Sequence, residues 1–314
     1  MAVLAGGIGG SKLLTGLYAQ LEGRDLTVVG NTGDDLRIHG LRVCPDLDTI
    51  TYTLTGLVEP ERGWGRAGET FHCLQELSRL GADTWFQLGD RDLALHLQRT
   101  RWLAEGLPLS HVTQRIAQAL GLGCRLLPMS EDYRPTCLET SQGRLHVQEY
   151  FVREGTRPRV KRLIFPESRP PAEGVSNALR QAEAIVIAPS NPFLSIQPIL
   201  ALDGVRRCLQ ERRQRVMVVT PVVGGKSLKG PTAKMLSELG HQVTAGGVAR
   251  IYQPLARHFI LDQRDAGLRR QIEAMGYKVH LADTVMNTRG EKIALARRVL
   301  DIFQDHLSTQ RESS

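Results

Sequence analysis

The chain of 314 residues is long enough for one large domain or two ordinary domains with a substantial buried core. Hydrophobic residues make up 41% and charged residues 23%, as in soluble globular proteins, and no apolar run is long enough to span a membrane. The net charge of +7 is dispersed and lacks interleaved aromatic residues, so we expect solvated surface charge and attraction for anionic substrates, with no nucleic-acid interface.

The cysteines and the N-terminus both indicate a cytoplasmic protein. The five cysteines are scattered, odd in number and without zinc-type spacing, so we expect unpaired, reduced thiols. The first residues, Met1 to Leu4, run directly into glycines and lack the charged and long apolar regions of a signal peptide. We therefore expect no secretion and no membrane anchor.

Short apolar stretches alternate with helix-forming sequence along most of the chain. After the first strand, Lys12 to Leu21 carries leucines at helical spacing. Continuous apolar strands that alternate with helices are typical of a parallel sheet covered on both faces, so the fold class predicted is a three-layer, Rossmann-like α/β fold with a mostly parallel sheet. The predicted strands are Met1–Leu4, Leu26–Val29, Trp85–Leu88, Ala184–Ala188 and Val216–Val219.

The middle of the chain breaks this alternation. Two helical stretches, Leu93–Glu105 and Ser110–Leu120 with Ser110 as a plausible N-cap, precede three short strand-like stretches. These are Arg125–Pro128, Thr136–Thr140 and Leu145–Val152, with a hairpin turn at 141–143. The prediction is an inserted α+β subdomain over 91–169, with residues 1–90 and 170–314 forming the Rossmann-like core.

The loop after the first strand is rich in glycine, and in open parallel sheets ligands bind beyond the carboxyl ends of the strands. Glycines let backbone N–H groups approach an anion closely, and the start of the next helix favours negative charge. The loop contains only G-x-G, with no full dinucleotide fingerprint and no P-loop, so a simple tight turn is the alternative. The candidate phosphate contacts are Gly7, Gly9, Gly10, Ser11 and Lys12.

Aspartates concentrate after the second strand. Magnesium usually takes one or two carboxylates together with substrate phosphates, so Asp34 and Asp48 are assigned as Mg²⁺ ligands and as catalytic residues. The sequence leaves open which two of the four aspartates, Asp34, Asp35, Asp46 and Asp48, bind the ion. For any one of them, a helix cap or a turn is the alternative role. Further substrate contacts are expected from Asn31, Asp35, His39, Asp46 and Thr49.

Polar side chains also follow the later strands. Asp90 is either a substrate contact or the cap of the helix after it. Two prolines fix the backbone around Ser190 and Asn191, so Ser190, Asn191 and Pro192 are expected to contact a polar ligand, with a rigid turn as the alternative. Lys226 and Lys229 are candidates to neutralise donor phosphates, or else are solvated surface charges.

Several of these motifs, taken in order, resemble the 2-phospho-L-lactate transferase family of deazaflavin coenzyme F-420 assembly. Each motif alone is weak, but their common order over residues 2 to about 297 is specific. A related family, the gluconeogenesis-factor-like proteins, shares the glycine loop and the Asp-Asp pair but lacks the matches at 39–41 and 44–49. The matching segments are 5–13, 31–35, 39–41, 44–49, 63–65 with 69–70, 88–93, 127–130, 148–152, 189–192 with 195–196, and 229–231.

The resemblance implies an activity. The family transfers a phospho-acid unit, of the 2-phospho-L-lactate or phosphoenolpyruvate type, from a guanosine diphosphate-linked donor to the terminal ribityl hydroxyl of the deazaflavin Fo, and GMP leaves. Its members are usually dimeric, so a homodimer is expected. Such a reaction needs alignment and charge neutralisation more than covalent help, which agrees with a glycine loop, aspartates and Mg²⁺.

A regulator on the same fold that binds a nucleotide or sugar without turnover is the second hypothesis. The segments Pro45–Thr49 and Pro189–Pro192 discriminate between the two, because a pure nucleotide sensor needs neither.

Overall fold

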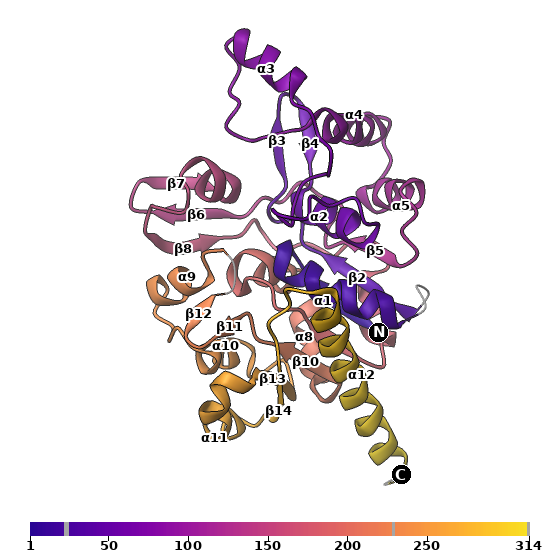
Figure 1. Cartoon of the computed structure of the whole chain (residues 1–314), viewed down its shortest axis with the longest axis vertical. Coiled ribbons are helices and arrows are strands. Elements are labelled where there is room, and N and C mark those ends of the chain that lie inside the picture. Colours follow the sequence, from indigo (N-terminus) through magenta and orange to yellow (C-terminus); the bar gives the residue numbers. More distant parts are fainter. Residues whose placement is uncertain (22–24, 228–229, 313–314) are drawn as a thin grey trace.

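A seven-stranded parallel sheet forms the centre of the molecule (Figure 1). The computed structural model describes residues 1–21, 25–227 and 230–312, with side chains as far as residue 305. In spatial order the strands are β14 (Lys278–Ala282), β13 (His258–Asp262), β10 (Val216–Val219), β9 (Ile185–Ile187), β1 (Ala2–Ala5), β2 (Thr27–Gly30) and β5 (Arg125–Pro128).

The order of the strands reverses between β1 and β9. From β1 the chain adds β2 and then β5 on one side, and it returns to add β9, β10, β13 and β14 on the other. Ligand crevices in open α/β sheets form at such a reversal, outside the carboxyl ends of the strands. The loops that follow β1 and β9 therefore flank the place where a site is expected.

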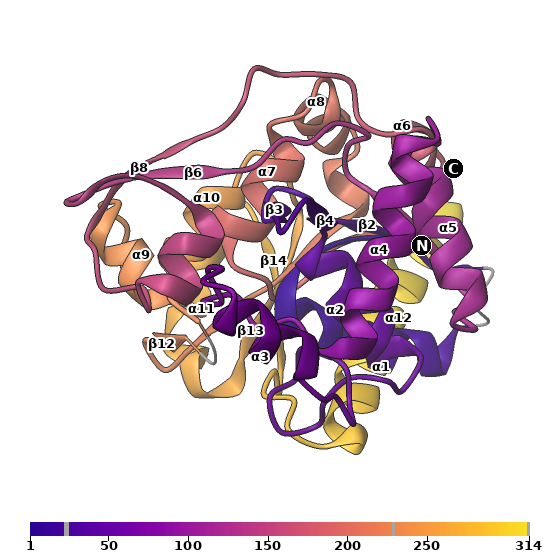
Figure 2. The same ribbon diagram turned by 90° about the horizontal axis from the view of Figure 1, so that it is seen from above.

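Helices cover both faces of the sheet, which confirms the three-layer α/β prediction (Figure 2). Alternate residues of β1 point to opposite faces: Val3 and Ala5 pack on one side, Ala2 and Leu4 on the other. The first face carries α1 (Gly7–Gln20), α2 (Pro45–Leu54), α5 (Leu109–Ala119) and α12 (Arg289–Glu312). The second carries α6 (Val175–Gln181), α7 (Gln197–Leu200), α8 (Val205–Glu211), α9 (Thr232–Glu238), α10 (Ala245–Tyr252) and α11 (Arg269–Glu273).

The apolar stretch Trp85–Leu88, predicted as a strand of the sheet, is not a strand. Its side chains pack instead in a small separate core, against the hairpin of β3 (Leu36–Ile38) and β4 (Leu41–Val43) and against α4 (Asp90–Ala104). An apolar run predicts only that its side chains are buried. Packing on a separate small core buries them without the strand pairing of a sheet. The hairpin and α4 lie at the top of Figure 1, with α3 (His72–Arg79) beyond them.

Packing departs from the predicted subdomain boundaries in two places. Strand β5 lies within the predicted insertion but pairs with β2 at the edge of the central sheet. The hairpin β3–β4 lies within the predicted core segment but shares its buried cluster with Leu93 of α4. Chain order alone does not reveal which strand an edge will accept, so these boundaries could not be placed from the sequence.

A second, antiparallel sheet of β6 (Cys137–Thr140), β7 (Gly143–His146) and β8 (Val160–Ile164) projects to one side. The predicted strand Leu145–Val152 is wrong beyond β7, since the chain turns into a π-helix, η2 (Glu149–Arg153). Ser110 is not an N-cap: α5 starts at Leu109 after Pro108. The remaining short elements are η3 (Pro192–Ile196), η4 (Arg213–Arg215), β11 (Val222–Val223), β12 (Lys226–Ser227) and η5 (Gln263–Leu268).

None of the helices within the described residues has the length and apolar character needed to cross a membrane. All five cysteines are unpaired.

Candidate functional site

A cavity of about 650 Å³ opens at the reversal of strand order, a size typical of small-molecule sites. Two chemically different sets of residues line it. We call one the charged wall: Gly6, Gly7, Gly9, Lys12, Asp34, Asp46, Asp48, Thr49, Ser190 and Ser195. We call the other the aromatic wall: Tyr52, Trp64, Trp85, Phe86 and Phe151.

The glycine loop is fixed by hydrogen bonds to the loops around it. The N–H of Gly6 donates to Ser190 Oγ (3.2 Å), and the N–H of Gly7 donates to Asp46 Oδ1 (2.6 Å). Gly7 has a φ of 63°, which glycine adopts without strain. A Cβ on Gly9 would lie 2.3 Å from the carbonyl oxygen of Pro189, so glycine is needed there for close packing of two loops, whatever ligand binds.

The buried amide of Asn31 joins two aspartates of the charged wall. Its Nδ2 donates to Asp46 Oδ2 (2.8 Å) and, at 3.4 Å, to Asp34 Oδ1. The other oxygen of Asp34 accepts from Gln148 Nε2 (3.1 Å), which comes from the segment between β7 and η2. Residues from four separate stretches of the chain therefore orient two carboxylates toward one cavity.

Among the residues that the structure describes, no cationic side chain forms an ion pair with either of these two carboxylates. Burial raises the pKa of Asp34 well above its usual range, and the neighbouring charge of Asp46 raises it further. Burial also raises the pKa of Asp46 to about 6, although its hydrogen bonds from Asn31 and Gly7 oppose this shift. Negative charge concentrated in a buried cavity favours a bound cation.

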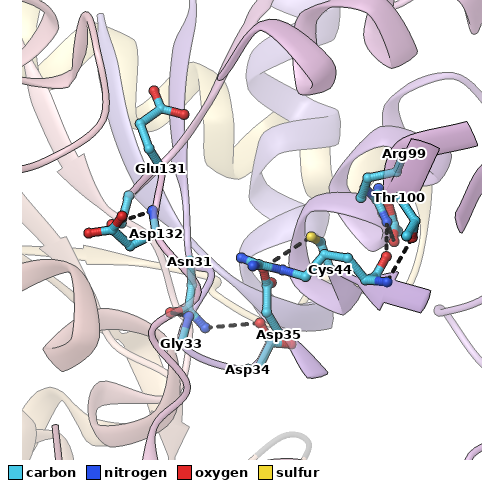
Figure 3. Close-up of polar contacts among 12 residues, drawn as sticks. Asn31, Gly33, Asp34, Asp35, Cys44, Arg99, Thr100, Glu131 and Asp132 are labelled. Atoms are coloured by element: carbon cyan, nitrogen blue, oxygen red, sulfur yellow. Dashed lines mark hydrogen bonds and ion pairs between the residues drawn. The ribbon is translucent and has the colours of Figure 1, made fainter. Parts of the chain in front are cut away.

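Asp35, the neighbour of Asp34, points the other way. Figure 3 shows Asp34 beside Asn31 and Asp35 beside Cys44. Asp35 is fully buried and accepts from the guanidinium of Arg42 at Nε (2.9 Å) and Nη2 (2.6 Å). It therefore ties the start of β3 to β4 at the base of their hairpin and does not line the cavity.

Asp48 is paired as well, but it does reach the cavity. The guanidinium of the buried Arg99 on α4 donates to both of its oxygens, with Nη1 to Oδ2 at 3.0 Å. Arg99 Nη1 also lies 3.1 Å from His96 Nδ1. Because a guanidinium only donates, Nδ1 of His96 is the acceptor and its proton is on Nε2. Burial lowers the pKa of His96 to about 4, so the ring is neutral at pH 7.

The rings of the aromatic wall lie in separate segments of the chain: Tyr52 on α2, Trp64 in the loop after α2, Trp85 and Phe86 before α4, and Phe151 in η2. Trp85 and Phe86 contact each other edge to face with ring centroids 5.6 Å apart, and the guanidinium of Arg153 lies 5.0 Å from the Trp85 ring centroid. Trp64 and Phe151 line the cavity yet remain 43% and 44% exposed. Large exposed aromatic groups at a cavity mouth are available to stack on a flat ligand.

Comparison with known proteins agrees with this geometry. The family model described as 2-phospho-L-lactate transferase CofD matches residues 1–297. The chain belongs to this family. It is 40% identical to the phosphoenolpyruvate transferase of Streptomyces griseus (97% of this chain, 98% of that one) and 41% identical to that of Mycobacterium tuberculosis (83% and 86%).

The fold is also found in a solved protein structure. A UPF0052 family protein from Bacillus halodurans has a TM-score of 0.62 at 15% identity, with 95% of this chain and 97% of that chain covered. At that identity the likeness concerns the fold alone.

About half of the residues predicted for the CofD family site do line the cavity. Those that do are Gly7, Gly9, Lys12, Asp34, Asp46, Asp48, Thr49, Ser190 and Asn191. Lys229 lies outside the described residues. The residues that lie outside the cavity lining are Gly10, Ser11, Asn31, Asp35, His39, Asp90, Pro192 and Lys226.

Most of these exceptions have a structural role. Ser11 Oγ donates to the carbonyl of Gly7, and His39 has a φ of 51° at the tip of the hairpin β3–β4. Asp90 accepts from the backbone N–H groups of His72 and Cys73, so it caps the helix before it, α3, instead of the helix after it. Lys226 is exposed on β12. Turn and cap residues resemble ligand contacts in a sequence because both need the same polar groups.

Sequence reasoning missed one face of α4. Asp92, His96 and Arg99 stand four and three residues apart, so they share one face of the helix, and that face is directed at the cavity. Charged residues on the buried side of a helix were the available indication. The aromatic wall gave no such indication, because isolated aromatic residues are usually core residues.

A divalent ion fits the residues present, but only with help from a substrate. Within the described residues there is no cluster of three or more His, Cys, Asp or Glu side chains placed to hold a metal. Asp34 presents an uncompensated carboxylate, while Asp48 is already held by Arg99. An ion with few protein ligands completed by phosphate oxygens and water is typical of Mg²⁺.

Proposed function

We propose that this protein transfers a phospho-acid unit, of the phosphoenolpyruvate or 2-phospho-L-lactate type, from a guanosine diphosphate-linked donor to the deazaflavin Fo in coenzyme F-420 biosynthesis. The acceptor hydroxyl bonds to the phosphorus that carries the acid. The bond from that phosphorus to the bridging oxygen breaks, and GMP leaves with the electron pair.

One observation carries the proposal: a single cavity at the strand reversal joins a wall suited to phosphates with a wall suited to a flat ring. The match of this chain to the CofD family model over residues 1–297 supports the same reaction class. The names of the relatives favour the phosphoenolpyruvate-type donor.

On the charged wall, α1 begins at Gly7, so the backbone N–H groups of its first turn have no acceptor within the helix. Gly7 donates to Asp46, which leaves the N–H groups that follow, together with the favourable field of the helix start, for donor phosphates. Lys12 lines the same cavity and adds a cationic group. These groups align the donor and offset its charge.

On the aromatic wall, Trp64, Trp85 and Phe86 offer ring faces and edges for the deazaflavin. Asn191, which the sequence predicts to contact a polar ligand, also lines the cavity, but its Oδ1 caps η3 by accepting from the N–H groups of Phe193 and Leu194. Its Nδ2 donates to the sulfur of Met235 at 3.8 Å, a weak acceptor, and the second N–H of this amide can donate to a ribityl hydroxyl.

Mg²⁺, when bound, neutralises phosphate charge in the transition state. Asp34 and Asp48 are the residues proposed to hold it, with Asp34 as the carboxylate that most needs a cation. Arg99 orients the carboxylate of Asp48.

The test is direct synthesis. The purified protein is incubated with Fo, Mg²⁺ and either the phosphoenolpyruvyl or the phospholactyl guanosine diphosphate. The products are then separated by chromatography and identified by mass spectrometry. We expect the Fo adduct and GMP in equal amounts, and no product with chelator. Binding of both ligands without product would instead support the non-catalytic regulator.

A further inference from the structure

The transfer proposed above needs a proton acceptor, because the attacking hydroxyl loses its proton as its oxygen bonds to phosphorus. Four carboxylates line the cavity in the described part of the chain. Three of them, Asp34, Asp46 and Asp48, accept hydrogen bonds at both oxygens and so are already held in place. The fourth is Asp92.

The start of α4 explains why Asp92 is free to act. An acidic residue in the first turn of a helix ordinarily serves as a cap. Here Glu69 fills that role, since its carboxylate accepts from the N–H groups of Arg91 (2.8 Å) and Asp92 (2.9 Å). Asp90 caps α3. The carboxylate of Asp92 has no capping role left and is directed into the cavity.

Only one oxygen of Asp92 is engaged. Its Oδ1 accepts from the phenol of Tyr52 at 2.6 Å, and none of the described residues donates a hydrogen bond to Oδ2. Asp48 and Tyr52 stand one turn apart on α2, about 5–6 Å between Cβ atoms. Asp92 is therefore near the carboxylate proposed to hold the metal and contacts Tyr52 of the wall proposed for the acceptor.

His96 is the other candidate base on this face, and its geometry excludes it. Its Nδ1 accepts from Arg99, so Nε2 already carries a proton.

We propose that Asp92 is the catalytic residue that accepts the proton of the attacking hydroxyl at Oδ2, and that Tyr52 positions it. The inference rests on the proposed function. In the step, the hydroxyl oxygen bonds to phosphorus, its proton moves to Asp92, and the phosphorus–oxygen bond to GMP breaks with the electron pair leaving on GMP.

The charges around Asp92 suit this role. Burial raises its pKa to about 6, the hydrogen bond from Tyr52 opposes the shift, and Asp48 and Glu69 add to it, while Arg99 lowers it. His96, which also faces this region, is neutral at pH 7. Asp92 is thus ionised at neutral pH yet a stronger base than an ordinary aspartate, which improves proton acceptance.

The test compares Asp92→Asn with Glu105→Gln, a control on an exposed residue that follows the same helix. In the parent enzyme we expect kcat to fall as the pH drops below about 6. Asp92→Asn should lower kcat by about 100-fold or more and remove this acidic limb, with GDP affinity by calorimetry and the unfolding temperature unchanged. Glu105→Gln should match the parent.

Tyr52→Phe gives an independent readout if Asp92→Asn folds poorly. Loss of the phenol hydrogen bond should raise the pKa of Asp92, so the acidic limb of kcat should move to higher pH. An unchanged kcat in Asp92→Asn, a rise in acceptor KM alone, or an unmoved limb in Tyr52→Phe would overturn the role of Asp92. A parent protein that makes no product would instead overturn the proposed function.

Discussion

The two walls of the cavity are built in different ways. The charged wall comes from the loops that follow β1, β2 and β9 and from the first turn of α2, and its groups are tied to one another, as in the contact of Gly7 with Asp46 and of Gly6 with Ser190. The aromatic wall comes from long excursions, and Trp64 and Phe151 remain over 40% exposed. The first wall is therefore preorganised for charge, while the second offers surface that a ligand completes.

The largest effect should come from breaking the buried pair behind the charged wall. Arg99→Met leaves the buried carboxylate of Asp48 without its partner, which should destabilise the protein by about 3–5 kcal/mol. Urea unfolding measures this loss. The double variant Arg99→Met with Asp48→Asn should recover part of it, and no recovery would mean that Arg99 acts through packing alone.

The next effect tests the charge of the same wall. Asp34→Asn removes the carboxylate that most needs a cation, so we expect transfer to fall about 100-fold, or ~3 kcal/mol in the barrier. The Mg²⁺ concentration for half-maximal rate should rise. Because the amide matches the carboxylate in size, the unfolding temperature serves as the control. A parent-like Mg²⁺ response would remove Asp34 from the metal assignment.

A smaller effect should come from the aromatic wall. Trp85→Ala should weaken Fo binding by about 1–3 kcal/mol, the range for stacking of an aromatic base on a side chain, and leave GDP affinity unchanged. Fo fluorescence and GDP calorimetry on one preparation separate the two walls. Equal losses for both ligands would show that the walls do not divide the substrates as we propose.

The smallest effect is expected at Lys226. It is exposed on β12 and lies outside the cavity lining, so Lys226→Ala should change GDP affinity by no more than about 0.5 kcal/mol. Titrations at low and high salt measure this. A clear loss that disappears in high salt would place the segment after β11 over the donor and extend the charged wall.

Only part of the site could be predicted from the sequence. Asp34, Asp46 and Ser190 were found because each follows a strand end, and parallel strands bring such loops to one edge. Asp35 and Asp90 were chosen on the same grounds, but their carboxylates serve an ion pair and a helix cap. Which way a polar side chain turns depends on its neighbours in space, and the sequence does not contain them.

The sequence by itself determined the alternation of strands and helices, hence the layered parallel sheet and the edge at which a ligand site is expected. Those follow from apolar periodicity and turn residues, which act locally. Only the tertiary structure decided that Trp85–Leu88 packs on a satellite core, that β5 joins the central sheet, and that Asp92 accepts a hydrogen bond from Tyr52. These contacts join residues up to about a hundred positions apart, and they depend on which surfaces remain to be buried once the local elements have formed.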